Sequence, residues 1–302
     1  MHRAALTALL AIATVGGAIG ASQIRYRTGI DVVGFTVTVL ERNGTPLTGL
    51  TVDDFEVRED GVAQNVTYFS AGGDDEAAPL HIGLMFDTSE SMEKDLSFSR
   101  GAAIKFLNTF PKALDFTLVD FATEVRAATF SQQEFPRLVA RVRNRPAKGM
   151  TALFDALSIY LGAAFDQSGR KVLVIYTDGG DSSSSRTWTE AARLLKASDV
   201  LVYPIGFMAN QGQGSARLVQ QSRLNEMASL TGGLAVFPSN MKELDRMYSR
   251  ISEEIHSQYS LGYVSSNAAR DGKWRKVDIH VKRPSSSRLQ VRTRPGYFAA
   301  AR

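Results

Sequence analysis

Three polar segments of this 302-residue chain hold the residues whose types and spacing could do chemistry. Asp87, Ser89 and Ser91 alternate within one short segment, Thr151 lies in a second, and Asp178 lies in a third. Carboxylate and hydroxyl oxygens are hard ligands that suit Mg²⁺, Mn²⁺ or Ca²⁺ and suit softer metals poorly. The five side chains therefore predict a site for one divalent cation, with Mg²⁺ as first choice and Mn²⁺ or Ca²⁺ as alternatives.

The neighbouring segments would bring these side chains together. Asp87 directly follows an apolar run at 80–86, and Asp178 comes just after another at 172–176. Thr151 opens a stretch with helical periodicity. In open α/β sheets, ligands bind beyond the carboxyl ends of the strands. We therefore expect all five side chains to lie at that edge of one sheet.

The middle of the chain alternates between strand and helix patterns. Apolar runs typical of strands occur at 80–86, 116–121, 172–176, 200–207 and 234–237, and helical patterns occur at 96–110, 151–165, 187–197, 216–230 and 241–255. Apolar strands that alternate with helices indicate a mainly parallel sheet covered on both faces. The run at 125–130 is expected to be a short antiparallel edge strand. The predicted fold class is α/β with a doubly wound, mainly parallel sheet.

Both flanks of this region have β character. Strand patterns occur at 33–39, 55–59, 62–68, 259–264, 273–282 and 288–293, and Asp60-Gly61 marks a hairpin turn. Neither flank alone can bury much apolar surface. We therefore predict one small β-sandwich built from 30–72 and 258–300, with the α/β domain at 78–257 inserted between them. Two separate small modules are the alternative.

The composition excludes several classes of site. The chain has no cysteine and four histidines, none of them at ligand spacing, which argues against zinc sites, disulfides and thiol nucleophiles. Its net charge of +4 comes from dispersed basic residues and indicates a solvated surface. No nucleic acid partner is expected.

The first residues resemble an export signal. A short basic start precedes a charge-free run at 4–20, and small-residue cleavage contexts lie at 18–20 and 19–21. We predict a signal peptide at 1–22 and an exported protein that is periplasmic, on the cell surface or secreted. The alternative is an uncleaved segment that anchors the chain in a membrane.

Taken together, the polar segments resemble the metal-ion-dependent adhesion site of von Willebrand factor A (VWA) domains. The resemblance consists of Asp-x-Ser-x-Ser after one strand, Gly-x-Thr opening a helix and Thr-Asp-Gly after another strand, and it covers about 80–257. It implies a Rossmann-like fold with the metal at the top of the sheet. By the family's pattern, the hydroxyls of Ser89, Ser91 and Thr151 ligate the metal, and Asp87 and Asp178 act directly or through water.

The flanks resemble a narrower group, a bacterial exported VWFA-related family. The similar segments are GLTVDDFEVREDG at 49–61, YSLGY at 259–263 and DGKWRK at 271–276. This resemblance supports the three-part layout and adds little about function.

Two classes of function compete for the predicted metal. The first is a binding or adhesion protein whose cation captures an Asp or Glu side chain of a protein partner. The second is a metal-dependent hydrolase, but Ser89 stands where a phosphatase loop has its second Asp, and no Gly-x-Ser-x-Gly motif or Cys–His pair is evident. We therefore predict a binding protein and no enzyme. A structural envelope protein with a vestigial site is a further alternative.

Three local interpretations concern other polar residues. Thr151 is a candidate helix N-cap in addition to its predicted metal role. Asp181 and the serine run at 182–185 suggest a solvated loop, and a segment that helps gate the site is the alternative. The charged stripe at 242–254 suggests the wet face of an amphipathic helix.

Overall fold

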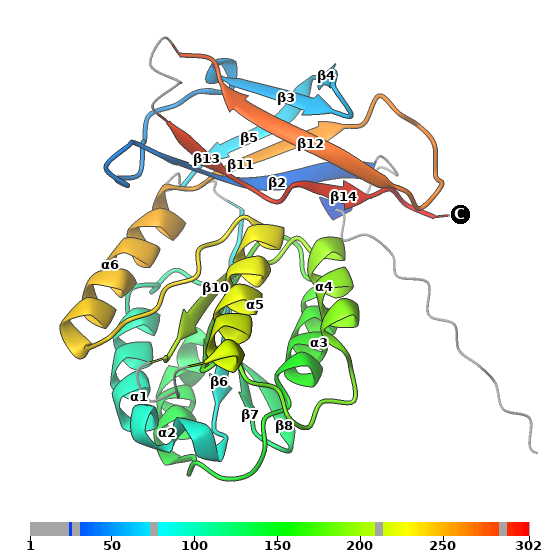
Figure 1. Ribbon diagram of the computed structural model, residues 1–302. Helices are drawn as coiled ribbons and strands as arrows, with labels where there is room; N and C mark the ends of the chain where they lie inside the picture. The colour runs from blue at the N-terminus through cyan, green and yellow to red at the C-terminus, as the bar shows by residue number, and fades with distance from the viewer. Residues whose placement is uncertain (1–23, 26–30, 73–77, 209–213, 284–288, 302) are drawn as a thin grey trace, which may run out of the picture.

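The computed structural model describes residues 24–25, 31–72, 78–208, 214–283 and 289–301. Figure 1 shows a helix-covered α/β body with a β body stacked against one end of it. The predicted signal peptide at 1–22 lies outside the described residues. Across the part of the chain that is described, no helix combines the length and apolarity needed to cross a membrane.

A five-stranded sheet forms the centre of the α/β body. Its strands are β6 (Leu80–Asp87), β7 (Asp115–Phe121), β8 (Val125–Ser131), β9 (Arg170–Thr177) and β10 (Leu201–Gly206). They lie in the order β10-β9-β6-β7-β8, and only the β7–β8 pair is antiparallel. The predicted mainly parallel sheet and its antiparallel edge strand are confirmed.

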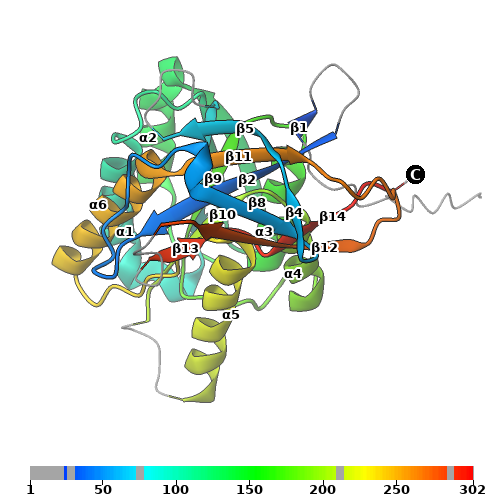
Figure 2. The ribbon, with the colours of Figure 1, turned by 90° about the horizontal axis from the view of Figure 1, so that it is seen from above.

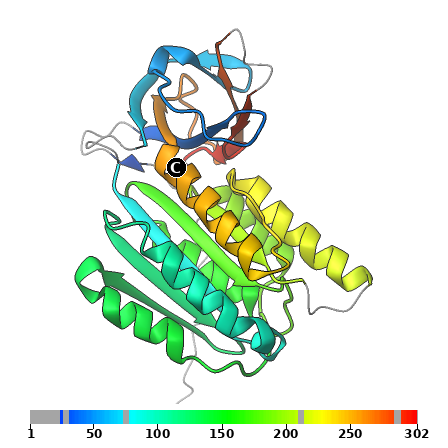
Figure 3. The same cartoon turned by 90° about the vertical axis from the view of Figure 1, so that its left-hand side faces the viewer.

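Helices cover both faces of this sheet (Figure 3). They are α1 (Glu93–Leu107), α2 (Phe135–Asn144), α3 (Leu153–Ala164), α4 (Trp188–Ala197), α5 (Ser215–Thr231) and α6 (Met241–Ser257). Successive strand residues point to opposite faces. Leu84 accordingly packs in the core beneath α1, α2 and α6, and Met85 packs in the core beneath α3, α4 and α5. The sheet is therefore doubly wound, as the fold class requires.

Two details of the α/β body differ from the sequence prediction. Helix α2 was not expected, because arginines dominate its exposed face and only Leu138 and Val142 are fully buried. The expected strand at 234–237 is reduced to a single bridge between Val236 and Ile205. Pro204 has no N–H, so it cannot supply the next donor that would extend this ladder.

The β body combines both flanks of the chain. One sheet contains β1 (Ile24–Arg25), β2 (Asp31–Leu40), β5 (Val66–Ala71), β11 (Tyr259–Val264) and β13 (Gln290–Arg292), and the other contains β3 (Phe55–Glu59), β4 (Val62–Gln64), β12 (Trp274–Val281) and β14 (Gly296–Phe298). β11 pairs with β2 on one side and β5 on the other, as Figure 2 shows from above, and β12 pairs with β3. Apolar side chains of both flanks share one core. The predicted sandwich is confirmed, and the alternative of two separate modules is wrong.

The predicted hairpin after β3 is only partly correct. Asp60 and Gly61 both have positive φ, and they connect β3 to β4 as expected. The returning strand, however, is interrupted at Asn65. β4 stays beside β3, whereas β5 crosses to the opposite sheet and pairs with β11. Alternation along 62–68 could not reveal this exchange, because the pattern does not identify the strand with which each part pairs.

Polar contacts join the two bodies at two places. Gln258 Nε2, where α6 runs into β11, donates to Tyr203 Oη at 3.0 Å, and Arg294 Nη1 donates to the Ser198 carbonyl at the end of α4 at 3.2 Å. Glu254, expected on the wet face of α6, is buried and bonded to Arg292 of β13. That expectation is wrong at Glu254, because the sandwich covers this end of the helix.

A buried histidine at the start of β6 makes the stability of the fold depend on pH. His81 Nδ1 lies 2.9 Å from Asp115 Oδ2, and Nε2 lies 3.0 Å from the Ser168 carbonyl. The hydrogen bond to Asp115 raises the pKa of His81, and burial opposes it. Because the pKa of His81 is higher in the folded state, protonated His81 stabilises the fold fully below its unfolded-state pKa of about 6.5. This stabilisation is lost as the pH rises through the pKa of His81 in the folded state.

We therefore expect the free energy of unfolding, measured by urea denaturation, to fall as the pH rises from about 6.5. His81→Gln should reduce this dependence, because it leaves no imidazole to titrate. An equally steep pH dependence in the variant would show that other groups cause it.

Candidate metal centre

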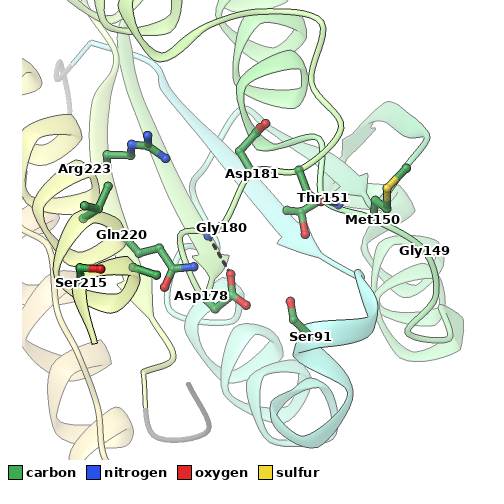
Figure 4. A pocket seen from close by; sticks show the side chains of 13 residues that line it. Ser91, Gly149, Met150, Thr151, Asp178, Gly180, Asp181, Ser215, Gln220 and Arg223 are labelled. Carbon is green, nitrogen blue, oxygen red and sulfur yellow. Dashed lines mark hydrogen bonds between the residues drawn. The ribbon is translucent and has the colours of Figure 1, made fainter. Parts of the chain in front are cut away.

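Three loops meet at the carboxyl end of the central sheet. They follow β6, precede α3 and follow β9, and β6 and β9 are adjacent parallel strands. Figure 4 shows Ser91, Thr151 and Asp178 pointing toward one space between these loops. This is the edge at which open α/β sheets bind ligands.

Asp87 is the last residue of β6, and its carboxylate has no exposed surface (0%). Oδ1 accepts a hydrogen bond from Ser89 N at 2.9 Å, and Oδ2 accepts one from Thr177 Oγ1 at 2.7 Å. Burial raises the pKa of Asp87 to about 7, the charge of Asp178 adds to the rise, and the bonds from Ser89 and Thr177 oppose it. An anion at this position would therefore be stabilised by a nearby cation.

The two serines form a pair of hydroxyls above Asp87. Ser89 precedes the short 3₁₀ helix η2 (Glu90–Met92), and Ser91 lies within it. Their Oγ atoms are 3.1 Å apart. Ser89 is buried and Ser91 is exposed, so the pair leads from the interior to the surface.

Thr151 is held by the loop after β9. Its N–H donates to Ser182 Oγ at 3.0 Å, and its carbonyl accepts from Ser182 N and Ser183 N at 2.8 and 3.0 Å. The N-cap of α3 is Ala152, without a side-chain cap. The prediction that Thr151 caps this helix is therefore wrong, and its buried side chain lies beside the pocket.

The segment after β9 caps α3 instead. Phe154 N donates to Asp181 Oδ2 at 3.0 Å and to Ser184 Oγ at 3.1 Å, and Asp155 N also donates to Ser184 Oγ at 3.1 Å. The Asp155 carboxylate in turn accepts from the N–H and the hydroxyl of Ser185. The interpretation of 181–185 as a solvated loop is incomplete, because Ser182 and Ser185 are exposed but the loop also caps α3. A helix N-terminus has unsatisfied N–H groups, and here a distant loop supplies the acceptors.

Asp178 follows β9 directly, is nearly fully buried and accepts a hydrogen bond from Gly180 N at 2.8 Å. With Ser91 and Thr151 it lines a pocket of about 530 Å³. Asp87 and Ser89 lie behind this wall, linked to it by the hydroxyl pair of the serines. The fold thus brings all five predicted residues to one edge of the sheet.

The donor set fits a hard divalent cation. Asp87 and Asp178 supply negative charge, and the three hydroxyls supply neutral oxygens. Among the described residues, no group of three or more His, Asp or Glu side chains could hold a metal. Hydroxyl groups would therefore have to complete the coordination of any cation bound here.

Sequence reasoning missed the far side of the pocket. Ser215, Val219, Gln220 and Arg223 of α5 line it opposite the predicted residues. The helical pattern at 216–230 indicated a helix and carried no signal for which face would turn toward the sheet edge.

The capping role of Asp181 leads to a prediction. Asp181→Ala should weaken Mg²⁺ binding roughly tenfold, because it releases the α3 terminus that positions Thr151 while leaving the five side chains unchanged. Calorimetry on the purified protein would measure this. Asp166→Ala, an exposed carboxylate at the opposite end of the sheet, is the matched control. Equal affinities in the two variants would contradict the positioning role.

Comparison with known proteins agrees with the geometry. The family model of the von Willebrand factor type A domain matches residues 81–250. Among curated proteins, none matches the chain in sequence.

Several solved structures are similar in fold. The PilB minor pilin from Streptococcus sanguinis has a TM-score of 0.49 and 16% identity, and the match covers 61% of this chain and 63% of PilB. A von Willebrand factor type A protein from Catenulispora acidiphila has a TM-score of 0.49 and 11% identity, and the match covers 91% of this chain and 75% of that protein. The vWF domain of the type V pili tip protein Mfa5 from Porphyromonas gingivalis has a TM-score of 0.47 and 11% identity, and the match covers 59% of this chain and 97% of that domain. This chain therefore spans less than two thirds of the length of PilB.

Proposed function

Because this chain belongs to the von Willebrand factor type A domain family, we propose that it is a metal-dependent binding protein. In this proposal the centre formed by Asp87, Ser89, Ser91, Thr151 and Asp178 holds Mg²⁺, or Mn²⁺ or Ca²⁺, and captures an Asp or Glu side chain of a protein partner. The observation that carries the proposal is the convergence of two buried carboxylates and a hydroxyl pair on an open pocket.

The contacts within the site support capture of an anion at its surface. When bound, the cation would supply positive charge and a position open to a partner's carboxylate. Asp87 is held on both oxygens by Ser89 and Thr177, so its orientation is set before binding. Ser91 is exposed at the pocket wall, which leaves the centre accessible to a protruding side chain.

A hydrolase would need an activated nucleophile or a general base. Serine hydroxyls line the pocket, but none of the described histidines lies there to activate one. Asp181, the other carboxylate at the pocket, already accepts hydrogen bonds from Phe154 and Ser184. These contacts favour binding over catalysis.

We also propose that the protein is exported, as the sequence at 1–22 suggests. Fractionation of cells producing the full chain, with mass spectrometry of its N-terminus, tests this. A mature chain that lacks the first residues, found outside the cytoplasm, is the expected result. An intact chain in the cytoplasm would contradict it.

Pull-down from an outer-surface or periplasmic extract tests the main proposal. We expect the wild-type protein to retain partners in Mg²⁺, to release them in EDTA and to lose them with Thr151→Ala. A panel of phosphate and ester substrates should show no metal-dependent hydrolysis. Turnover that disappears with Asp178→Ala would contradict the proposal and indicate a hydrolase.

A further inference from the structure

Helix α5 forms a second wall of the pocket, beyond the five candidate ligands. Its residues at the pocket are Ser215, Ala216, Val219, Gln220 and Arg223. Figure 4 shows Asp178 between Gln220 on one side and Thr151 on the other, with Arg223 beyond it. A partner that reaches the metal centre therefore also meets α5.

Arg223 brings positive charge to this wall. Its guanidinium lies 5.6 Å from the centre of the Phe154 ring, and within the described part of the chain it has no carboxylate partner. A planar guanidinium can bond both oxygens of a carboxylate at once. This position therefore favours an acidic group beside the one at the metal centre.

Gln220 lies between the metal centre and Arg223, and its side chain carries an unsatisfied acceptor. Its Oε1 atom is buried and has no hydrogen-bond donor among the described residues. A buried acceptor without a donor is costly. Because this oxygen has no exposed surface, a partner can reach only the other atoms of the Gln220 side chain at the pocket.

Two exposed apolar side chains flank the pocket. Val219 is 47% exposed and Met150, across the pocket, is 55% exposed. All the fully buried residues of α5 lie in its C-terminal half, from Leu224 onward. Figures 2 and 3 show the other half reaching beyond the domain. Exposed apolar groups around a charged site are typical of a protein interface.

We propose that the N-terminal half of α5 is a second subsite for an extended, diacidic segment of a protein partner. One carboxylate of the segment lies at the metal centre and the other pairs with Arg223. The segment passes over Gln220 between them, and its apolar groups cover Val219 and Met150. This inference rests on the proposed function and specifies the partner that the site selects.

Labelled synthetic peptides test the subsite. Each has a Gly-Ser background and two glutamates separated by one, two or three glycines, and each has a partner peptide in which the second glutamate is glutamine. Fluorescence anisotropy would measure binding to the full chain in Mg²⁺ and in EDTA. The variants are Arg223→Gln and Arg223→Lys, with Arg217→Gln as control because Arg217 lies on the same helix and does not line the pocket.

We expect the best diacidic peptide to bind wild type and Arg217→Gln about fivefold more tightly than its monoacidic partner. Arg223→Gln should remove this difference without changing the affinity for the monoacidic peptide. Arg223→Lys should restore part of it, because the charge returns without the paired donors. Metal-dependent binding with equal affinity for both peptides in wild type would overturn the subsite alone. Binding that EDTA does not affect, or no binding at all, would contradict the proposed function and the subsite with it.

Discussion

Asp87→Asn is expected to weaken Mg²⁺ binding at least about a hundredfold, because it removes one of the two buried negative charges of the centre. The amide keeps the size of the side chain and retains an oxygen that can accept from Thr177 Oγ1. Isothermal calorimetry with the purified protein measures the change. Asp166→Asn removes an equal charge from an exposed position and should bind Mg²⁺ like wild type.

Thermal unfolding provides a second readout for the same variant. A cation that binds only the folded state raises its melting temperature. Mg²⁺ should therefore stabilise wild type and leave Asp87→Asn unchanged. Without metal, the variant should be folded, because burial already penalises the charge that it removes. Wild-type Mg²⁺ affinity in Asp87→Asn would exclude this site as the metal centre.

Leu261→Asp is expected to open the β-sandwich and expose strands that are distant in the sequence. Leu261 is 1% exposed at the centre of β11, paired with Phe35 of β2 and Phe69 of β5. An unpaired carboxylate buried there should cost several kcal/mol, because Leu261 packs among the apolar side chains of this core. Limited proteolysis should then cleave within 31–71, about two hundred residues from the substitution along the chain.

Val264→Asp is the matched control on the same strand. Val264 is 43% exposed, so its carboxylate would remain hydrated and the 31–71 segment should stay protected. Protection of that segment in Leu261→Asp as well would show that the N-terminal strands are stable without β11. The shared core of the two flanks would then contribute little to their stability.

Local patterns predicted the central sheet because its signals lie within single elements. β6 and β9 are buried along nearly their whole length, so their sequences are continuous apolar runs. Asp87 ends one run and Asp178 follows the other directly. Parallel strands share one carboxyl edge, so the position of both residues there was accessible from the sequence.

Other features depend on partners that lie far away in the chain. The exchange of sheets at Asn65 depends on β11, about two hundred residues later, and the burial of Glu254 depends on β13. Alternation and amphipathic patterns report that a face is buried, and they do not identify what buries it.

The candidate site shows the same division between sequence and tertiary structure. The amino-acid sequence by itself determined the five oxygen-bearing side chains and the strand ends that carry them. Only the tertiary structure decided that Asp181 and Ser184 cap α3, and that Gln220 and Arg223 face the same pocket. The physical reason is the distance along the chain over which each effect acts. Strand burial and turn chemistry act between near neighbours in the chain. Capping by another loop, and the face that a helix turns toward a pocket, are set only when the packed core fixes the positions of distant segments.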